Sequence, residues 1–139
     1  MKLPLAVAFL LVASCSGKAN YTISVHGALS CSQVFHFRIT LWELDLFNHD
    51  MIGRISTLRS NDTSAMYHIS AHAYDGGAES EVEPLMTIEH SCGTLSYGSN
   101  GCLCKDFGDV GADLEVKMDV DLEKPDLKYC DICEDARKL

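Results

Sequence analysis

Beyond its first residues, the sequence lacks any hydrophobic run long enough to cross a membrane, and it is poor in basic residues. A membrane-spanning helix needs about 20 apolar residues, and no stretch after the start of the chain approaches that length. The chain holds 11 Lys and Arg against 20 Asp and Glu, a formal net charge of −9. This balance argues against binding to nucleic acid and against unaided binding to anionic membranes. We therefore expect a soluble protein with no nucleic-acid partner and no transmembrane segment.

The one marked apolar run lies at the start of the chain. It covers residues 3–13, follows Lys2, and is itself followed by small residues. Such a run is typical of a secretory signal peptide, so we expect residues 1–16 to be removed and residues 17–139 to form one secreted, extracellular domain. The residues before Cys15 also resemble a bacterial lipobox, which would instead leave an acylated cysteine at a cell surface.

Six cysteines remain if the leader is removed: Cys31, Cys92, Cys102, Cys104, Cys130 and Cys133. An even number in a short exported chain is typical of a disulfide framework. The last four, spaced C-x-C and C-x-x-C, also resemble half-sites of a zinc ribbon. Disulfides are favoured in an exported chain, so we expect no metal and no cofactor. Because a bond within C-x-C is strained, we expect bonds that cross between the two pairs.

Alternation of apolar and polar residues dominates the chain and predicts β-strands with one buried face. The longest faultless alternation comes late in the chain, between Leu114 and Leu122. At least six short strands at this spacing favour an all-β fold, an antiparallel β-sandwich. The predicted strands cover residues 21–31, 35–41, 51–58, 67–69, 85–92 and 114–122.

Short helical or coil segments are expected between and after these strands. Residues 78–83 could form one or two helical turns that end before Pro84. Residues 93–109 are rich in glycine, and we expect a loop there that crosslinks hold in place. The polar tail after Pro125 predicts short helix or coil.

Cys31 and Cys92 each end a predicted strand on its buried face. In a two-layer sandwich such strand ends can approach within about 7 Å between Cα atoms, the distance that a disulfide requires. We therefore expect a bond between them.

Three short motifs occur in order along the chain. Residues 27–31 have the form G-x-L-x-C, residues 41–45 read Leu-Trp-Glu-Leu-Asp ahead of Asp-Met-Ile at 50–52, and residues 83–92 have the form E-P-x-x-x-I-x-H-x-C. Their order and separation resemble the nematode transthyretin-like family. The resemblance covers residues 21–92 and fades beyond them, so the cysteines nearest the C-terminus look like an addition.

This resemblance implies a transthyretin-like, disulfide-stapled β-sandwich that is secreted and non-enzymatic. It implies a binding or adaptor role toward an extracellular protein or lipid, and it disfavours the lipobox because a nematode protein would not use one. Two alternatives stay open. One is a carrier of small hydrophobic ligands in a groove, and the other is a disulfide-rich effector or protease inhibitor that contacts its target through residues 93–109. The oligomeric state does not follow from the sequence.

No catalytic or histidine metal site is expected. The 5-hydroxyisourate hydrolases share the transthyretin sandwich and end in Tyr-Arg-Gly-Ser, whereas this chain ends Ala-Arg-Lys-Leu. His68 and His72 have the spacing of two ligands on a helix, but their surroundings predict strand and turn. His26 and His36 lie on polar strand faces, where exposure is expected. His90 lies on an apolar face, where a buried and hydrogen-bonded histidine is expected.

Two sequons for N-glycosylation occur, at Asn20 and Asn61. Asn61 lies in a predicted turn and is the better acceptor. Asn20 lies near the expected new N-terminus.

Overall fold

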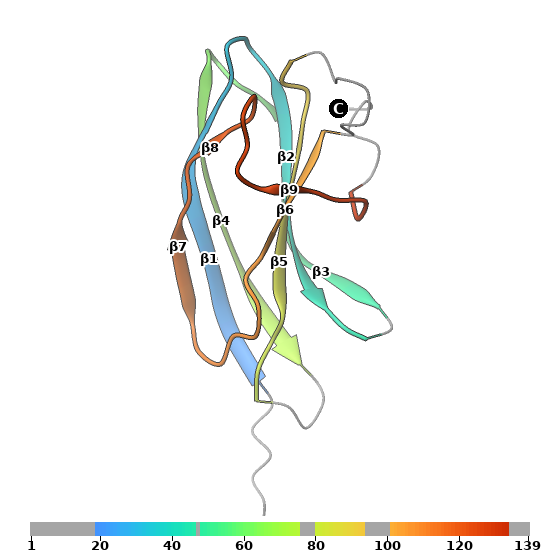
Figure 1. The fold of residues 1–139 in the computed structure, drawn as a ribbon. Helices are drawn as coiled ribbons and strands as arrows, with labels where there is room; N and C mark the ends of the chain where they lie inside the picture. Colours follow the sequence, from blue (N-terminus) through green and yellow to red (C-terminus); the bar gives the residue numbers. More distant parts are fainter. Residues whose placement is uncertain (1–18, 47, 76–79, 94–100, 134–139) are drawn as a thin grey trace, which may run out of the picture.

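The computed structural model describes residues 19–46, 48–75, 80–93 and 101–133. These residues form two β-sheets that face each other across an apolar interior (Figure 1). No helix occurs in these ranges, and hence none with the length and apolarity of a membrane span. The predicted leader, residues 1–16, lies outside them. The fold is an all-β sandwich.

The first sheet contains four strands: β1 (Ala19–Ser30), β4 (Ser64–Asp75), β7 (Leu114–Lys117) and β8 (Val120–Asp121). β1 lies in the middle and is antiparallel to β4 over its whole length, from Ala19 opposite Asp75 to Ser30 opposite Ser64. Along its other edge, β1 runs parallel to β7 and then to β8. The sheet is therefore mixed, a detail that alternation cannot predict because it carries no information on strand direction.

The second sheet contains five strands in the order β3-β2-β5-β6-β9, all pairs antiparallel. The strands are β2 (His36–Leu44), β3 (His49–Arg59), β5 (Pro84–His90), β6 (Cys102–Asp106) and β9 (Lys128–Tyr129). All seven residues of β5 are buried, unlike those of any other strand. Because the two faces of a strand point in opposite directions, both faces of this sheet are covered at its centre.

Apolar side chains from the two sheets fill the space between them. Full burial of a side chain of this kind stabilises the fold by about 1.5–3 kcal/mol relative to exposure. Except for Leu103, which lies in the predicted loop, they come from the faces that the alternation predicts to be buried. The largest fully buried ones are Ile23, Val25, Leu29, Phe35, Phe37, Ile39, Leu41, Met86, Ile88 and Leu103.

The last predicted strand is interrupted at Met118 and Asp119, and Gly27 allows this. The Met118 amide donates a hydrogen bond of 2.8 Å to the His26 carbonyl oxygen. The Met118 carbonyl oxygen would lie only 1.9 Å from a Cβ atom on Gly27. The Asp119 carboxylate accepts a hydrogen bond of 2.9 Å from the Ala28 amide. The chain therefore crosses close over β1 where glycine leaves room, and pairing resumes with β8.

The same carbonyl oxygen of Met118 accepts a hydrogen bond of 2.7 Å from the Tyr67 hydroxyl. Tyr67 lies on β4, on the far side of β1. Burial, aided by the nearby Asp119 charge, raises the pKa of Tyr67 to about 12, so the hydroxyl stays a donor over any physiological pH. This bond ties both edges of the first sheet together above Gly27.

Two segments predicted to lack strands are in fact paired. β4 continues to Asp75, well past the short strand predicted over residues 67–69. Its later core-facing residues, Ala71 and Ala73, are small and gave only a weak apolar pattern in the sequence. Ser80 to Glu83 are not helical, and Val82 forms a bridge with Val110 that is closed by hydrogen bonds of 2.9 and 2.8 Å. Residues 78 and 79, where the predicted helical segment begins, lie outside the described ranges.

The predicted loop and tail also contain strands. Within residues 93–109, β6 pairs with β5, although residues 94–100 lie outside the described ranges. In the tail, β9 pairs with β6, where Tyr129 lies opposite Leu103. β6 and β9 are five and two residues long, too short to show an alternation of apolar and polar residues, which explains why the sequence predicted neither strand.

Replacing Gly27 with alanine should destabilise the fold, because the new methyl group would collide with the Met118 backbone. We expect a loss of about 1–3 kcal/mol or more, the usual range for overpacking. Urea denaturation of the full chain measures this.

Gly111→Ala is the matched control, because its Cβ atom would meet only the Glu81 side chain, at 3.6 Å. Equal stability losses in the two variants would contradict this view of the crossing.

Candidate functional site

The six cysteines form three disulfides. Cys31 is bonded to Cys92, and their Cα atoms are 6.0 Å apart. Cys31 directly follows β1 in one sheet, and Cys92 lies two residues after the end of β5 in the other. A crosslink over a loop of 61 residues stabilises by about 4 kcal/mol in the chain-entropy model. The bond therefore holds the two sheets together at one end.

The other two disulfides join the C-terminal segment to β6. They link Cys102 to Cys133 and Cys104 to Cys130, so each crosses between the two cysteine pairs. The Sγ atoms of Cys102 and Cys130 also lie 3.2 Å apart, which places the two bonds in contact. Every cysteine in the described ranges is oxidised, so none offers the thiolate that a zinc ribbon needs.

Beneath these crosslinks, the outer face of the second sheet carries a buried ion pair. Arg38 of β2 donates from Nε and Nη2 to the two carboxylate oxygens of Glu89 on β5, each at 2.7 Å. The Glu89 side chain is 2% exposed. Cys102 lies directly opposite Glu89 in the pairing of β5 with β6. Both carboxylate oxygens of Glu89 are bonded to Arg38, which marks the pair as structural.

Two more polar contacts extend this layer along the same face. Trp42 Nε1 donates to Thr87 Oγ1 at 2.9 Å, and Arg54 Nε donates to Thr40 Oγ1 at 3.1 Å. Sequence reasoning did not find this layer. The polar residues of β5, Thr87 and Glu89, were the available sign of it, but polar residues on one face of a strand normally predict exposure to solvent.

His90 is buried in the interior next to a disulfide. It is 3% exposed, and its Nδ1 accepts a hydrogen bond of 3.1 Å from the amide of Cys92. Nε2 has no hydrogen-bond partner among the described residues. Burial lowers the pKa of His90 to about 4, so the ring is neutral at physiological pH. A neutral ring without access to solvent serves packing.

Of the histidines on polar strand faces, His68 and His72 are exposed, whereas His26 and His36 are half-buried and not exposed as expected. The pairing of those in the first sheet follows its register. His68 lies opposite His26, and its Nε2 is 3.0 Å from Ser24 Oγ. His72 lies opposite Thr22 and contacts its hydroxyl at 3.4 Å. The structure therefore does not bring His68 and His72 together.

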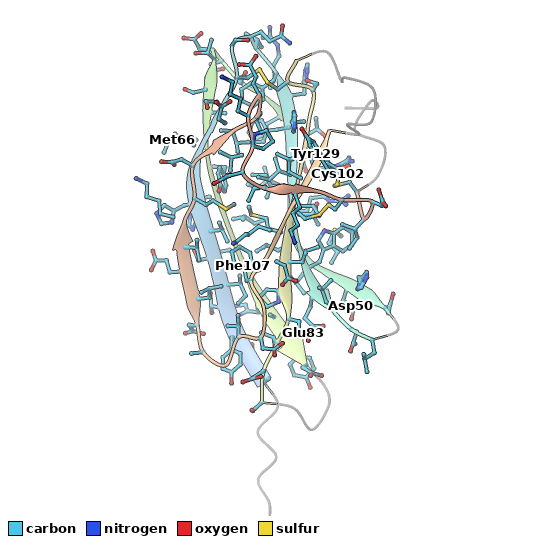
Figure 2. The ribbon with its side chains drawn as sticks, in the orientation of Figure 1. Asp50, Met66, Glu83, Cys102, Phe107 and Tyr129 are labelled. Carbon is cyan, nitrogen blue, oxygen red and sulfur yellow. A yellow bond between two sulfur atoms is a disulfide. The ribbon has the colours of Figure 1, made fainter. Side chains whose placement is uncertain are left out.

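The outer face of the first sheet is open. The side chains of β4 alternate between buried and exposed positions along almost the whole strand. One exposed position holds Met66, with 78% of its surface accessible. Figure 2 places Met66 at the outer side of this sheet, away from the second sheet. A single exposed apolar side chain is common on protein surfaces, so Met66 is a candidate contact point only because of the hollows beside it.

Two hollows flank Met66. The first, about 500 Å³, is lined by His26, Met66, Tyr67, His68 and Glu115. The second, about 420 Å³, lies at the turn between β3 and β4, and it shares Met66 with the first. Leu58, itself 49% exposed, lines the second hollow.

We call this area the Met66 surface. It combines an adaptable thioether side chain, which suits binding surfaces, with polar groups on either side. It consists of His26, Leu58, Asn61, Met66, His68 and Glu115.

Both asparagines of the glycosylation sequons are exposed. Asn20 lies within β1, and Asn61 lies in the turn between β3 and β4, where it lines the second hollow. Most of the suggested contact loop of a protease inhibitor, residues 94–100, lies outside the described ranges.

No protein-family model matches this chain, and no curated protein matches it either.

Stability should fall as the pH drops from about 6.5 to about 4, because of His90. In this range the unfolded chain binds a proton at His90, whereas the folded chain, with its lowered pKa, does not. The full loss is about 3 kcal/mol. Urea denaturation of wild type and His90→Gln at each pH isolates the stability loss that His90 causes. This loss should be absent above neutral pH. A variant with the same acid sensitivity as wild type would contradict it.

Breaking the Arg38 and Glu89 pair from one side should cost about 3–5 kcal/mol, because a buried charge is left without its partner. Arg38→Met alone should therefore be much less stable than the double variant Arg38→Met, Glu89→Leu. Urea denaturation of the two variants and wild type measures this difference. If the double variant were the less stable of the two, the ion pair would have a different role.

Proposed function

We propose that this chain is a secreted, non-enzymatic binding protein with a transthyretin-like sandwich, which contacts an extracellular partner through the Met66 surface. The observation that carries the proposal is the contrast between the two outer faces. One is covered over β5 and β6 by the chain's own crosslinked C-terminal segment, and the other presents Met66 between two hollows.

Export is supported by three disulfides within the described ranges. Such bonds form and persist in oxidising compartments. The apolar run over residues 3–13 supports a cleaved leader. The motifs around Cys31 and Cys92 support the family proposal, and their bond across the sheets is what a stapled sandwich requires.

A binding role is supported by the chemistry of the Met66 surface. Methionine is flexible and polarisable, so it adapts to a partner's contours. Leu58 adds a second exposed apolar group beside it, and His68 and Glu115 supply polar groups that can fix an orientation. Mixed apolar and polar surfaces of this kind suit protein partners. A protein is therefore the partner we propose.

The carrier alternative is less well supported. A transthyretin-type carrier holds an apolar ligand in a groove or channel. Here Phe35, Phe37 and Met86 fill the space between the sheets and are fully buried. The hollows at Met66 are open to solvent, whereas a ligand pocket buries most of the surface of its ligand.

The proposal predicts that Met66→Asp abolishes partner capture without unfolding the protein. A side chain with this exposure contributes little to stability, within about 0.5 kcal/mol. Immobilised wild type and variant are incubated with extracellular fluid, and bound proteins are identified by mass spectrometry. A specific partner should be retained by wild type and lost from the variant.

Met51→Asp is the matched control, since Met51 is also exposed, at 53%, but lies on β3 away from both hollows. Loss of the partner from both variants, or from neither, would overturn the assignment to the Met66 surface. Flotation with phosphatidylserine vesicles, with and without calcium, tests a lipid partner instead. Binding to vesicles that survives Met66→Asp would replace the proposed protein partner by a membrane.

A further inference from the structure

His26 and His68 lie directly opposite each other on β1 and β4, on the outer face of the first sheet. Their rings meet edge to face with centroids 6.2 Å apart. Residues opposite each other in an antiparallel pair have Cβ atoms about 4.5–5.5 Å apart. From this separation two imidazoles can reach a single ion at the usual metal–nitrogen distance of about 2.0–2.1 Å.

A carboxylate from a third strand faces the same hollow. Glu115 of β7 lies opposite Ser24, which is two residues before His26 on the same face of β1. The His68 ring already leans toward this position, because its Nε2 lies 3.0 Å from Ser24 Oγ. Two imidazoles and one carboxylate therefore come from three neighbouring strands to one hollow.

We propose that His26, His68 and Glu115 form a zinc-binding site on the outer face of the first sheet. Two histidine nitrogens and one carboxylate oxygen are a ligand set that zinc takes, with a fourth position for water. In the structure, the donor atoms of these three residues are not all within coordinating distance of one another. The His68 and Glu115 side chains are exposed, so both can adjust toward an ion without disturbing the core.

Ser24 is a positioning residue for this site. In the tautomer of His68 that donates from Nε2 to the Ser24 hydroxyl, Nδ1 keeps the lone pair that a metal ion needs. Such outer hydrogen bonds orient a ligating histidine and typically change metal affinity by about 10- to 100-fold.

Lys117 of β7 lies opposite His26, and its positive charge would repel a cation at this site. Its Nζ lies 4.0 Å from Asp119 Oδ2, so a carboxylate already faces it. The Lys117 side chain is 70% exposed, and water and salt screen its field at the hollow.

His72 shows what the site requires. It lies on the same strand and the same outer face as His68, but its opposite residue is Thr22, whose hydroxyl it contacts. It does not line the hollow. His72→Ala is therefore a control that removes an exposed histidine from the same strand and leaves the proposed ligands in place.

The test is calorimetric titration of the full, disulfide-bonded, tag-free chain with Zn²⁺. Wild type should bind one ion at this site. His26→Ala and His68→Ala should each weaken binding by at least about tenfold, because the loss of a ligand exceeds the loss of an outer partner. Glu115→Gln and Ser24→Ala should also weaken it, and His72→Ala should not.

Titration with Co²⁺ gives a second measurement, since the intensity of its visible absorption reports tetrahedral coordination and should disappear in His68→Ala. Thermal denaturation without metal verifies that each variant is folded, and His26→Gln and His68→Gln replace any alanine variant that is not. No binding by wild type, unchanged affinity in the His26 and His68 variants, or an equal loss in His72→Ala would overturn the site.

The zinc site shares His26, His68 and Glu115 with the Met66 surface, but the two proposals are decided by different experiments. Titration with the ion alone decides the zinc site, whereas partner capture is decided by Met66→Asp.

Discussion

The hydrogen bonding of β1 along both of its edges is the constraint on which the rest of the structure depends. β4 occupies one edge completely, and β7 and β8 share the other. The two short strands can do so only because the chain between them passes close over Gly27. The Tyr67 hydroxyl then binds the carbonyl oxygen at this crossing from the opposite edge. Pairing on both sides thus fixes which side chains meet on the outer face.

The two outer faces of the sandwich differ in their exposure to solvent. On the second sheet, the C-terminal segment is bonded to β6 through two disulfides, and the polar side chains of β5 are buried with their partners beneath it. On the first sheet, the outward positions of β4 remain exposed. Crosslinking one face to its own tail leaves the other as the surface that is open for contact.

Much of the fold was predictable, because burial on one face of a strand imposes a period of two on the sequence. This holds for β1 and β2, whose apolar faces form the core. It failed for β6 and β9, which are too short to show this period, and for the end of β4, where alanines are buried. For the candidate site, sequence reasoning weighed only the spacing of His68 and His72 and expected no histidine metal site. The real neighbour, His26, lies 42 positions away along the chain.

By itself, the sequence determined which residues face the core, how many cysteines are available for crosslinks, and the acidic balance, because these follow from composition and local periodicity. Only the tertiary structure decided the register of β4 on β1, the parallel direction of β7 and the covering of Glu89. Register and direction depend on contacts between segments far apart in the chain, and alternation along one strand is the same whichever partner it meets. The grouping of His26, His68 and Glu115 belongs to that second class.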